Sequence, residues 1–185
     1  MAAMTHGNGA RTNRWRIAGW GAAALLLLAP LAAGQLSAEP GWTAADFALA
    51  AVMLGGIGLG LELAVRRSGD SAYRIGAAIA LATGVLLVAT NGALGIIGSE
   101  REDANLLYLA APAVALLGSL AARFRASGTA AAMAAAALAT ALVPPLASVL
   151  GIAVAPIWTA QVLALTGGFC ALWLASAWFF RKAAA

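Results

Sequence analysis

The side chains that could do chemistry here are four polar residues within or beside long apolar runs: Glu62, Asn91, Asn105 and Gln161. A carboxylate inside a membrane segment is by default a proton- or cation-linked group. An amide there either hydrogen-bonds neighbouring helices together or binds a solute. We therefore take these four as the candidate ligand or pathway residues.

Glu62 and Asn91 do not belong to one site. Glu62 lies four residues before Arg66, so both residues share one helical face and are expected to form an ion pair at a helix end. A proton- or cation-linked role is the alternative. Asn91 lies deeper in the next apolar run, where it predicts either hydrogen bonding between helices or a substrate contact. About 15 Å along the membrane normal separates the two side chains.

A polar region is expected toward the outer end of the runs. Pro144 and Pro145 predict a bent or broken helix. A bend beside Asn91 and Gln161 would open a small cavity toward the acidic turn 100–103; ordinary polar helix ends near water are the alternative. Ser99 and Glu102 in that turn fit a helix-capping box. The turn matches no metal-loop spacing, so we predict no metal and no cofactor.

Several classes of site are excluded by residue counts and motifs. The one histidine, His6, lies in the polar N-terminal segment, which excludes a bis-histidine haem, a zinc protease site or a Ser-His triad within the apolar runs. The phosphate-loop motif is missing. The one cysteine, Cys170, is expected to behave as a small hydrophobe. We predict that the chain is not an enzyme.

Composition assigns the chain to the membrane. Of its 185 residues, 63% are hydrophobic and 10% charged, which a soluble domain of this size cannot bury. The runs are apolar on every face rather than alternating, so helices are expected instead of barrel strands. The basic residues sit in small groups at the ends of the runs, which argues against nucleic-acid binding.

The predicted fold is an all-α bundle of six transmembrane helices. The expected organisation is a disordered cytoplasmic tail at 1–16 and a membrane domain at 17–182, with spans at 17–36, 44–65, 73–97, 105–122, 129–150 and 157–180. The first span also resembles a secretory signal, but it is long enough to cross a bilayer, so we expect it to be retained. Nearly all Lys and Arg residues fall on the side of the N-terminus, which predicts cytoplasmic termini.

Parts of the sequence resemble a family of small, uncharacterised multi-pass inner-membrane proteins of proteobacteria. The resemblance covers 46–108, with FALAAVMLGGIGLGLELAVRRSGDSAYR, NGALGIIGSE and AN-LLY, and also FCALWLASAWFFRKA near the C-terminus. It implies a location in the bacterial inner membrane and carries over no activity.

The predicted function is that of a non-catalytic integral membrane protein. Its expected partners are the lipid bilayer and either further copies of itself or a larger membrane complex, to which it would be an accessory or structural component. The alternative is a small transporter or channel for a solute or ion, with an outward-facing polar cavity near Asn91 and Gln161.

Overall fold

The computed structural model describes Gly21 and residues 43–185. The predicted tail at 1–16 and the predicted first span at 17–36, Gly21 apart, lie outside these residues. The chain divides into two compact units, 1–60 and 61–185, with the boundary inside the first described helix. In the first unit the described segment is the N-terminal part of that helix; the second unit holds its end and all the later helices.

Residues 43–185 are helical and contain no strand. The elements in order are α2 (Ala44–Arg67), α3 (Ser71–Ala93), the 3-10 helix η1 (Asp103–Leu109), α4 (Ala110–Ala121), α5 (Ala126–Leu150) and α6 (Ala160–Lys182). The expectation of an all-α chain is confirmed for this part of the sequence. The described helices number five, besides η1.

Four helical segments are long and apolar enough to cross a membrane: Ser71–Ala93, Asp103–Ala121, Ala126–Leu150 and Ala160–Lys182. They contain 19 to 25 residues, and about 20 residues of α-helix span the hydrocarbon core of a bilayer. The segment Asp103–Ala121 combines η1 and α4. The expectation of several membrane-length apolar helices is therefore confirmed.

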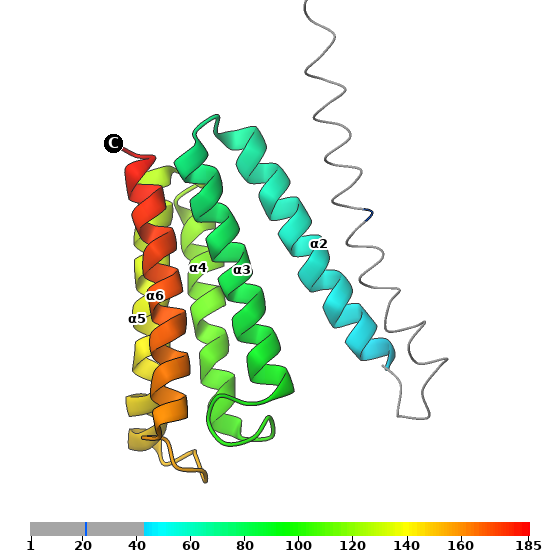
Figure 1. Cartoon of the computed structure of the whole chain (residues 1–185), viewed down its shortest axis with the longest axis vertical. Coiled ribbons are helices and arrows are strands. Elements are labelled where there is room, and N and C mark those ends of the chain that lie inside the picture. Colours follow the sequence, from blue (N-terminus) through cyan, green and yellow to red (C-terminus); the bar gives the residue numbers. More distant parts are fainter. Residues whose placement is uncertain (1–20, 22–42) are drawn as a thin grey trace, which may run out of the picture. The chain divides into compact units, whose positions relative to one another are not determined.

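Helices α3 to α6 run alternately up and down and pack as a bundle (Figure 1). Helix α6 packs on both α3 and α5, and α4 packs on α5; the sequence neighbours α3 and α4 share few contacts. Small residues allow this close approach. A Cβ atom added to Gly76 would lie 3.2 Å from the Phe180 ring, and one added to Gly118 would lie 2.7 Å from Cβ of Ala132.

The helix ends have identifiable causes. The Asp70 carboxylate accepts a hydrogen bond from the Tyr73 amide at 3.0 Å and caps α3. Thr159 caps α6 in the same way by accepting from the Val162 amide at 3.2 Å. Helix α5 ends at Gly151, whose φ of 63° is the left-handed conformation that glycine adopts without strain. The last helix therefore begins three residues after the predicted start of its span at 157, because Thr159 caps it.

Helix α3 ends at Ala93, four residues before the predicted end of its span. The chain then turns at Gly95, with φ 74°, and folds Ile96 and Ile97 back into the core, where neither side chain is exposed. Hydropathy places these isoleucines in the membrane-spanning run because they are apolar. Their burial comes from a loop and not from a longer helix.

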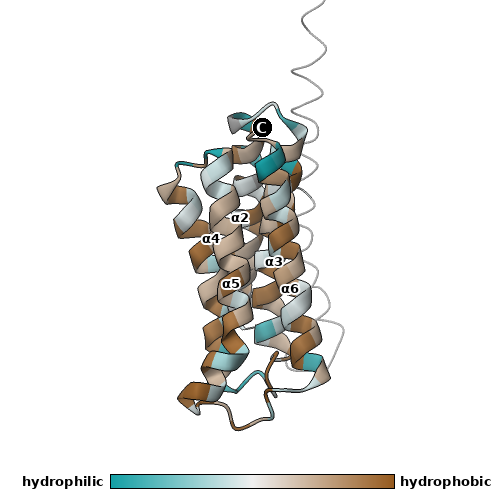
Figure 2. Cartoon of the chain, turned by 90° about the vertical axis from the view of Figure 1, so that its left-hand side faces the viewer, coloured by the Kyte–Doolittle hydropathy of each residue, from teal (hydrophilic) through white to brown (hydrophobic). Residues whose placement is uncertain are grey.

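The outer sides of helices α3 to α6 are apolar. Figure 2 shows hydrophilic colouring gathered at the two ends of this bundle and hydrophobic colouring along its sides. Large apolar side chains are exposed there, among them Leu86, Leu117, Leu138 and Leu174. Exposed apolar surface of this extent is expected of helices that face lipid or another apolar partner.

The two ends of this bundle carry different charges. At the end formed by the start of α3, the α4–α5 connection and the end of α6, hereafter the basic end, lie Arg74, Arg123, Arg125, Arg181, Lys182 and one acid, Asp70. The opposite end, hereafter the acidic end, carries Glu100, Arg101, Glu102 and Asp103.

Candidate functional site

Asn105, in η1, holds the loop that follows α3. Its side-chain oxygen accepts hydrogen bonds from the amides of Ile96 at 3.1 Å and Ile97 at 2.9 Å. Its side-chain nitrogen donates to the carbonyls of Ile97 at 3.1 Å and Ser99 at 2.7 Å. Asn105 is buried, and these four bonds satisfy backbone groups that have no helical partner. Its amide is therefore fully occupied by the chain itself.

Asn91, on the last turns of α3, joins this arrangement. Its side-chain nitrogen donates to the backbone carbonyl of Asn105 at 2.9 Å, and the residue is 7% exposed. The contact links α3 to η1, which is the interhelical hydrogen bonding that one interpretation of the sequence predicts. The Asn91 side-chain oxygen is buried and has no hydrogen-bond partner among the described residues. That atom is an acceptor open to a water molecule or a polar ligand group.

Gln161 is not part of this cluster. It lies exposed in the first turn of α6, whereas Asn91 and Asn105 are buried. Of the two outcomes predicted at Pro144 and Pro145, a bent or a broken helix, the break is wrong, because α5 continues through both prolines to Leu150. Membrane helices accommodate proline when neighbouring helices support the turn. Val143 and Pro144 are buried in the bundle, which holds this turn in place.

The acidic end is organised by hydrogen bonds within the chain. The Glu102 carboxylate accepts from the Val154 amide at 3.1 Å and so ties the loop after α3 to the loop before α6. The predicted capping box is wrong: Glu102 itself precedes η1, and no side chain caps this helix. In the part of the chain that the structure covers, no three His, Cys, Asp or Glu side chains converge as a metal site.

Glu62 pairs with Arg66 on α2, as the four-residue spacing predicts. The Glu62 side chain is 20% exposed and that of Arg66 is 67% exposed. Pairs at this spacing in a helix contribute about 0.2–0.5 kcal/mol to stability. Neither Asn91 nor Asn105 is a hydrogen-bond partner of this pair.

Sequence reasoning missed several buried polar contacts between distant segments. The hydroxyls of Tyr108 and Thr166 lie 2.6 Å apart and link η1 to α6. The Ser176 hydroxyl donates to the Gly76 carbonyl at 2.8 Å and links α6 to α3. These residues belong to otherwise apolar runs, and small hydroxyls in such runs are the signal of interhelical hydrogen bonding. Trp173 is also buried, and within 43–185 its ring nitrogen has no hydrogen-bond partner.

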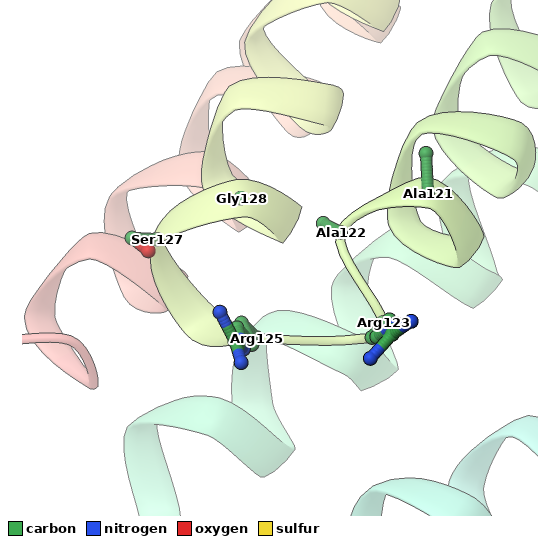
Figure 3. Close-up of a pocket in the computed structure, with 6 residues that line it drawn as sticks. All are labelled: Ala121, Ala122, Arg123, Arg125, Ser127 and Gly128. Carbon is green, nitrogen blue, oxygen red and sulfur yellow. The ribbon is translucent and has the colours of Figure 1, made fainter.

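A pocket lies at the basic end, far along the helices from Asn91. It has a volume of about 290 Å³ and is lined by Ala121, Ala122, Arg123, Arg125, Ser127 and Gly128, hereafter the basic pocket. Figure 3 shows these residues at the end of α4, along the connection and on the first turn of α5. This pocket is therefore not the outward-facing cavity predicted near Asn91 and Gln161.

The α4–α5 connection, which carries Arg123 and Arg125, is held by hydrogen bonds to α4 and α3. Arg123 and Phe124 both adopt left-handed backbone conformations, with φ of 51° and 56°. The Phe124 amide donates to the Ser119 carbonyl at 2.8 Å, which closes the end of α4. The Tyr73 hydroxyl donates to the Phe124 carbonyl at 2.9 Å and anchors the connection to α3.

No family model, curated protein or solved structure matches the chain. The resemblance to uncharacterised inner-membrane proteins therefore stays a prediction. The function has to be argued from the geometry of the residues described above.

Proposed function

We propose that the chain is a non-catalytic, multi-pass protein of the bacterial cytoplasmic membrane that packs on further copies of itself or on a larger membrane complex. In this proposal the termini and the basic end face the cytoplasm, since Lys and Arg are retained on that side of a membrane. It follows that the acidic end faces outward.

The observation that carries the proposal is that the side-chain amides of Asn91 and Asn105 hydrogen-bond to the backbone of the chain itself. All four hydrogen bonds of the Asn105 side chain go to the backbone of the chain, and the Asn91 side-chain nitrogen donates to the Asn105 carbonyl. Groups that hold a loop in this way are unavailable to a passing solute. They act instead to give the end of the bundle one fixed structure.

The outer faces of the helices supply surface for packing. Among the described residues, no atom lies within 4 Å of a Cβ added to Gly167 or Gly168 on α6, and both glycines are exposed. No described atom lies within 4 Å of a Cβ added to Gly55 or Gly56 on α2. Small residues on apolar helices are the usual contact points of helices that associate in lipid, where van der Waals packing replaces the hydrophobic effect.

The unpartnered side-chain oxygen of Asn91 is the observation that favours the alternative, a small transporter or channel. A buried acceptor of this kind could bind a polar solute during passage. An intramembrane polar group without a partner is costly, so it is retained where it has a use.

The mass of the chain isolated from native membranes in mild detergent tests the proposal. We expect a defined complex, either an oligomer or an assembly with a stoichiometric partner, by native mass spectrometry. The opposing result is a monomer that conducts a solute after reconstitution into vesicles and loses that flux in Asn91→Leu. Gln161→Leu, which alters an exposed amide near the same end, is the matched control for the flux measurement.

A further inference from the structure

The basic pocket has the chemistry of a phosphate site. Two exposed arginines, Arg123 and Arg125, line it. Guanidinium groups bind phosphate oxygens through paired hydrogen bonds as well as charge. Ser127, in the first turn of α5, also lines the pocket and carries a hydroxyl donor.

The first turn of α5 contributes to the same pocket. Helix α5 has 25 residues, and Arg125 occupies its cap position without making a side-chain cap bond. The first amides of a helix lack carbonyl partners within it, and the helix dipole makes this end attractive to anions. Ser127 and Gly128, which belong to this turn, line the pocket.

Side chains at the basic end are also those expected at the headgroup level of a bilayer. The Lys182 ammonium lies 5.6 Å from the centre of the Trp178 ring, and Trp178 packs edge-on against Phe179. Aromatic and basic residues together mark the boundary between hydrocarbon and water. The pocket lies at the end of Asp103–Ala121 and the start of Ala126–Leu150, two segments of membrane length.

We propose that the basic pocket binds the phosphate of an anionic phospholipid headgroup in the cytoplasmic leaflet. The inference rests on the membrane orientation given under the proposed function. Arg123 and Arg125 bind the phosphate oxygens, and the first turn of α5 supplies amide donors to the same group. The lipid brings its phosphate to the level of the pocket, whereas free phosphate has to be drawn from solution.

The test compares two double variants of the full chain in mild detergent. Arg123→Gln with Arg125→Gln removes the charges of the pocket, and Arg181→Gln with Lys182→Gln removes two charges at the same end outside it. Native mass spectrometry during a titration with phosphatidylglycerol should show binding about 10- to 30-fold weaker in the pocket variant. The control variant should stay within about twofold of the wild type.

Further measurements distinguish a lipid phosphate from free phosphate, and a loss of lipid binding from a failure of a variant to fold. Phosphatidylcholine and inorganic phosphate should each bind wild-type protein at least about tenfold more weakly than phosphatidylglycerol does. In wild-type protein, a photoactivatable phosphatidylglycerol should crosslink within 121–128, a result that does not depend on any variant folding.

Equal phosphatidylglycerol binding by both double variants would overturn the proposal, as would crosslinks confined to other segments. Inorganic phosphate that binds as tightly as the lipid would overturn the lipid assignment. The masses recorded in the same spectra report oligomers or partners separately, so failure of lipid binding and failure of the proposed assembly are distinguishable.

Discussion

Asn105→Ala should destabilise the bundle by about 3 kcal/mol, because the change leaves buried backbone groups without hydrogen-bond partners, each costing roughly 1–3 kcal/mol. The groups left without a partner are the amides of Ile96 and Ile97 and the carbonyl of Ile97, whereas the Ser99 carbonyl still accepts from the Glu102 amide. Both isoleucines are fully buried, so water does not replace the lost bonds without opening the loop. In mild detergent we expect the thermal midpoint to fall by about 6–12 °C.

Gln161→Ala is the matched control for this loss. It also removes one side-chain amide near the acidic end, but from an exposed position in the first turn of α6. Its effect should stay within about 0.5 kcal/mol. Equal midpoints for Asn105→Ala and Gln161→Ala would show that Asn105 does not hold the loop after α3.

Gly118→Leu should separate α4 from α5 and cost about 2–3 kcal/mol, the upper part of the range of about 1–3 kcal/mol found when extra atoms are forced into a packed interior. A Cβ at Gly118 would lie 2.7 Å from Cβ of Ala132 and 3.4 Å from its Cα. The second atom belongs to the backbone, so a change of side-chain rotamer does not relieve the contact. Thermal unfolding in mild detergent measures the loss.

A reciprocal exchange tests whether this one contact is responsible. Gly118→Ala alone should destabilise the protein, and adding Ala132→Gly should restore much of the loss by removing the opposing Cβ. Gly92→Ala on α3, where no described atom lies within 4 Å of an added Cβ, should be neutral or stabilising through helix propensity. No recovery in the double variant would contradict the packing of α4 on α5 described above.

The sequence was sufficient to predict helices and their approximate positions. Runs such as 126–150 are apolar on every face, and helices satisfy their own backbone in lipid. The pairing of Glu62 with Arg66 was also predictable, because it depends on a spacing within one helix. These features are local, so the order of residues determines them directly.

The structural role of Asn105, which holds the loop after α3, could not be predicted in the same way. Its partners are backbone groups of a loop that hydropathy assigns to a helix, because Ile96 and Ile97 are as apolar as the run before them. From the sequence, the Asn105 side chain therefore resembled a candidate ligand-binding group rather than a group that stabilises a turn. The Tyr108–Thr166 contact spans 58 residues and depends on how η1 meets α6, which no single run reveals.

The continuous α5 illustrates a further limit of local reasoning. Pro144 lacks an amide hydrogen and would weaken a helix exposed to water. In this bundle Val143, Pro144 and Ala147 are buried, and packing on these side chains outweighs the missing hydrogen bond. Tertiary context thus decides the outcome at this position.

Thiol labelling tests the proposed orientation, on which both the function and the lipid site depend. In a Cys170→Ala background, one new cysteine replaces Glu100 at the acidic end and another, in a separate variant, replaces Ser127 at the basic end; both positions are exposed. A membrane-impermeant maleimide applied to intact bacterial spheroplasts should label Glu100→Cys but label Ser127→Cys only after lysis. Labelling of Ser127→Cys in intact spheroplasts, with Glu100→Cys protected until lysis, would contradict the account.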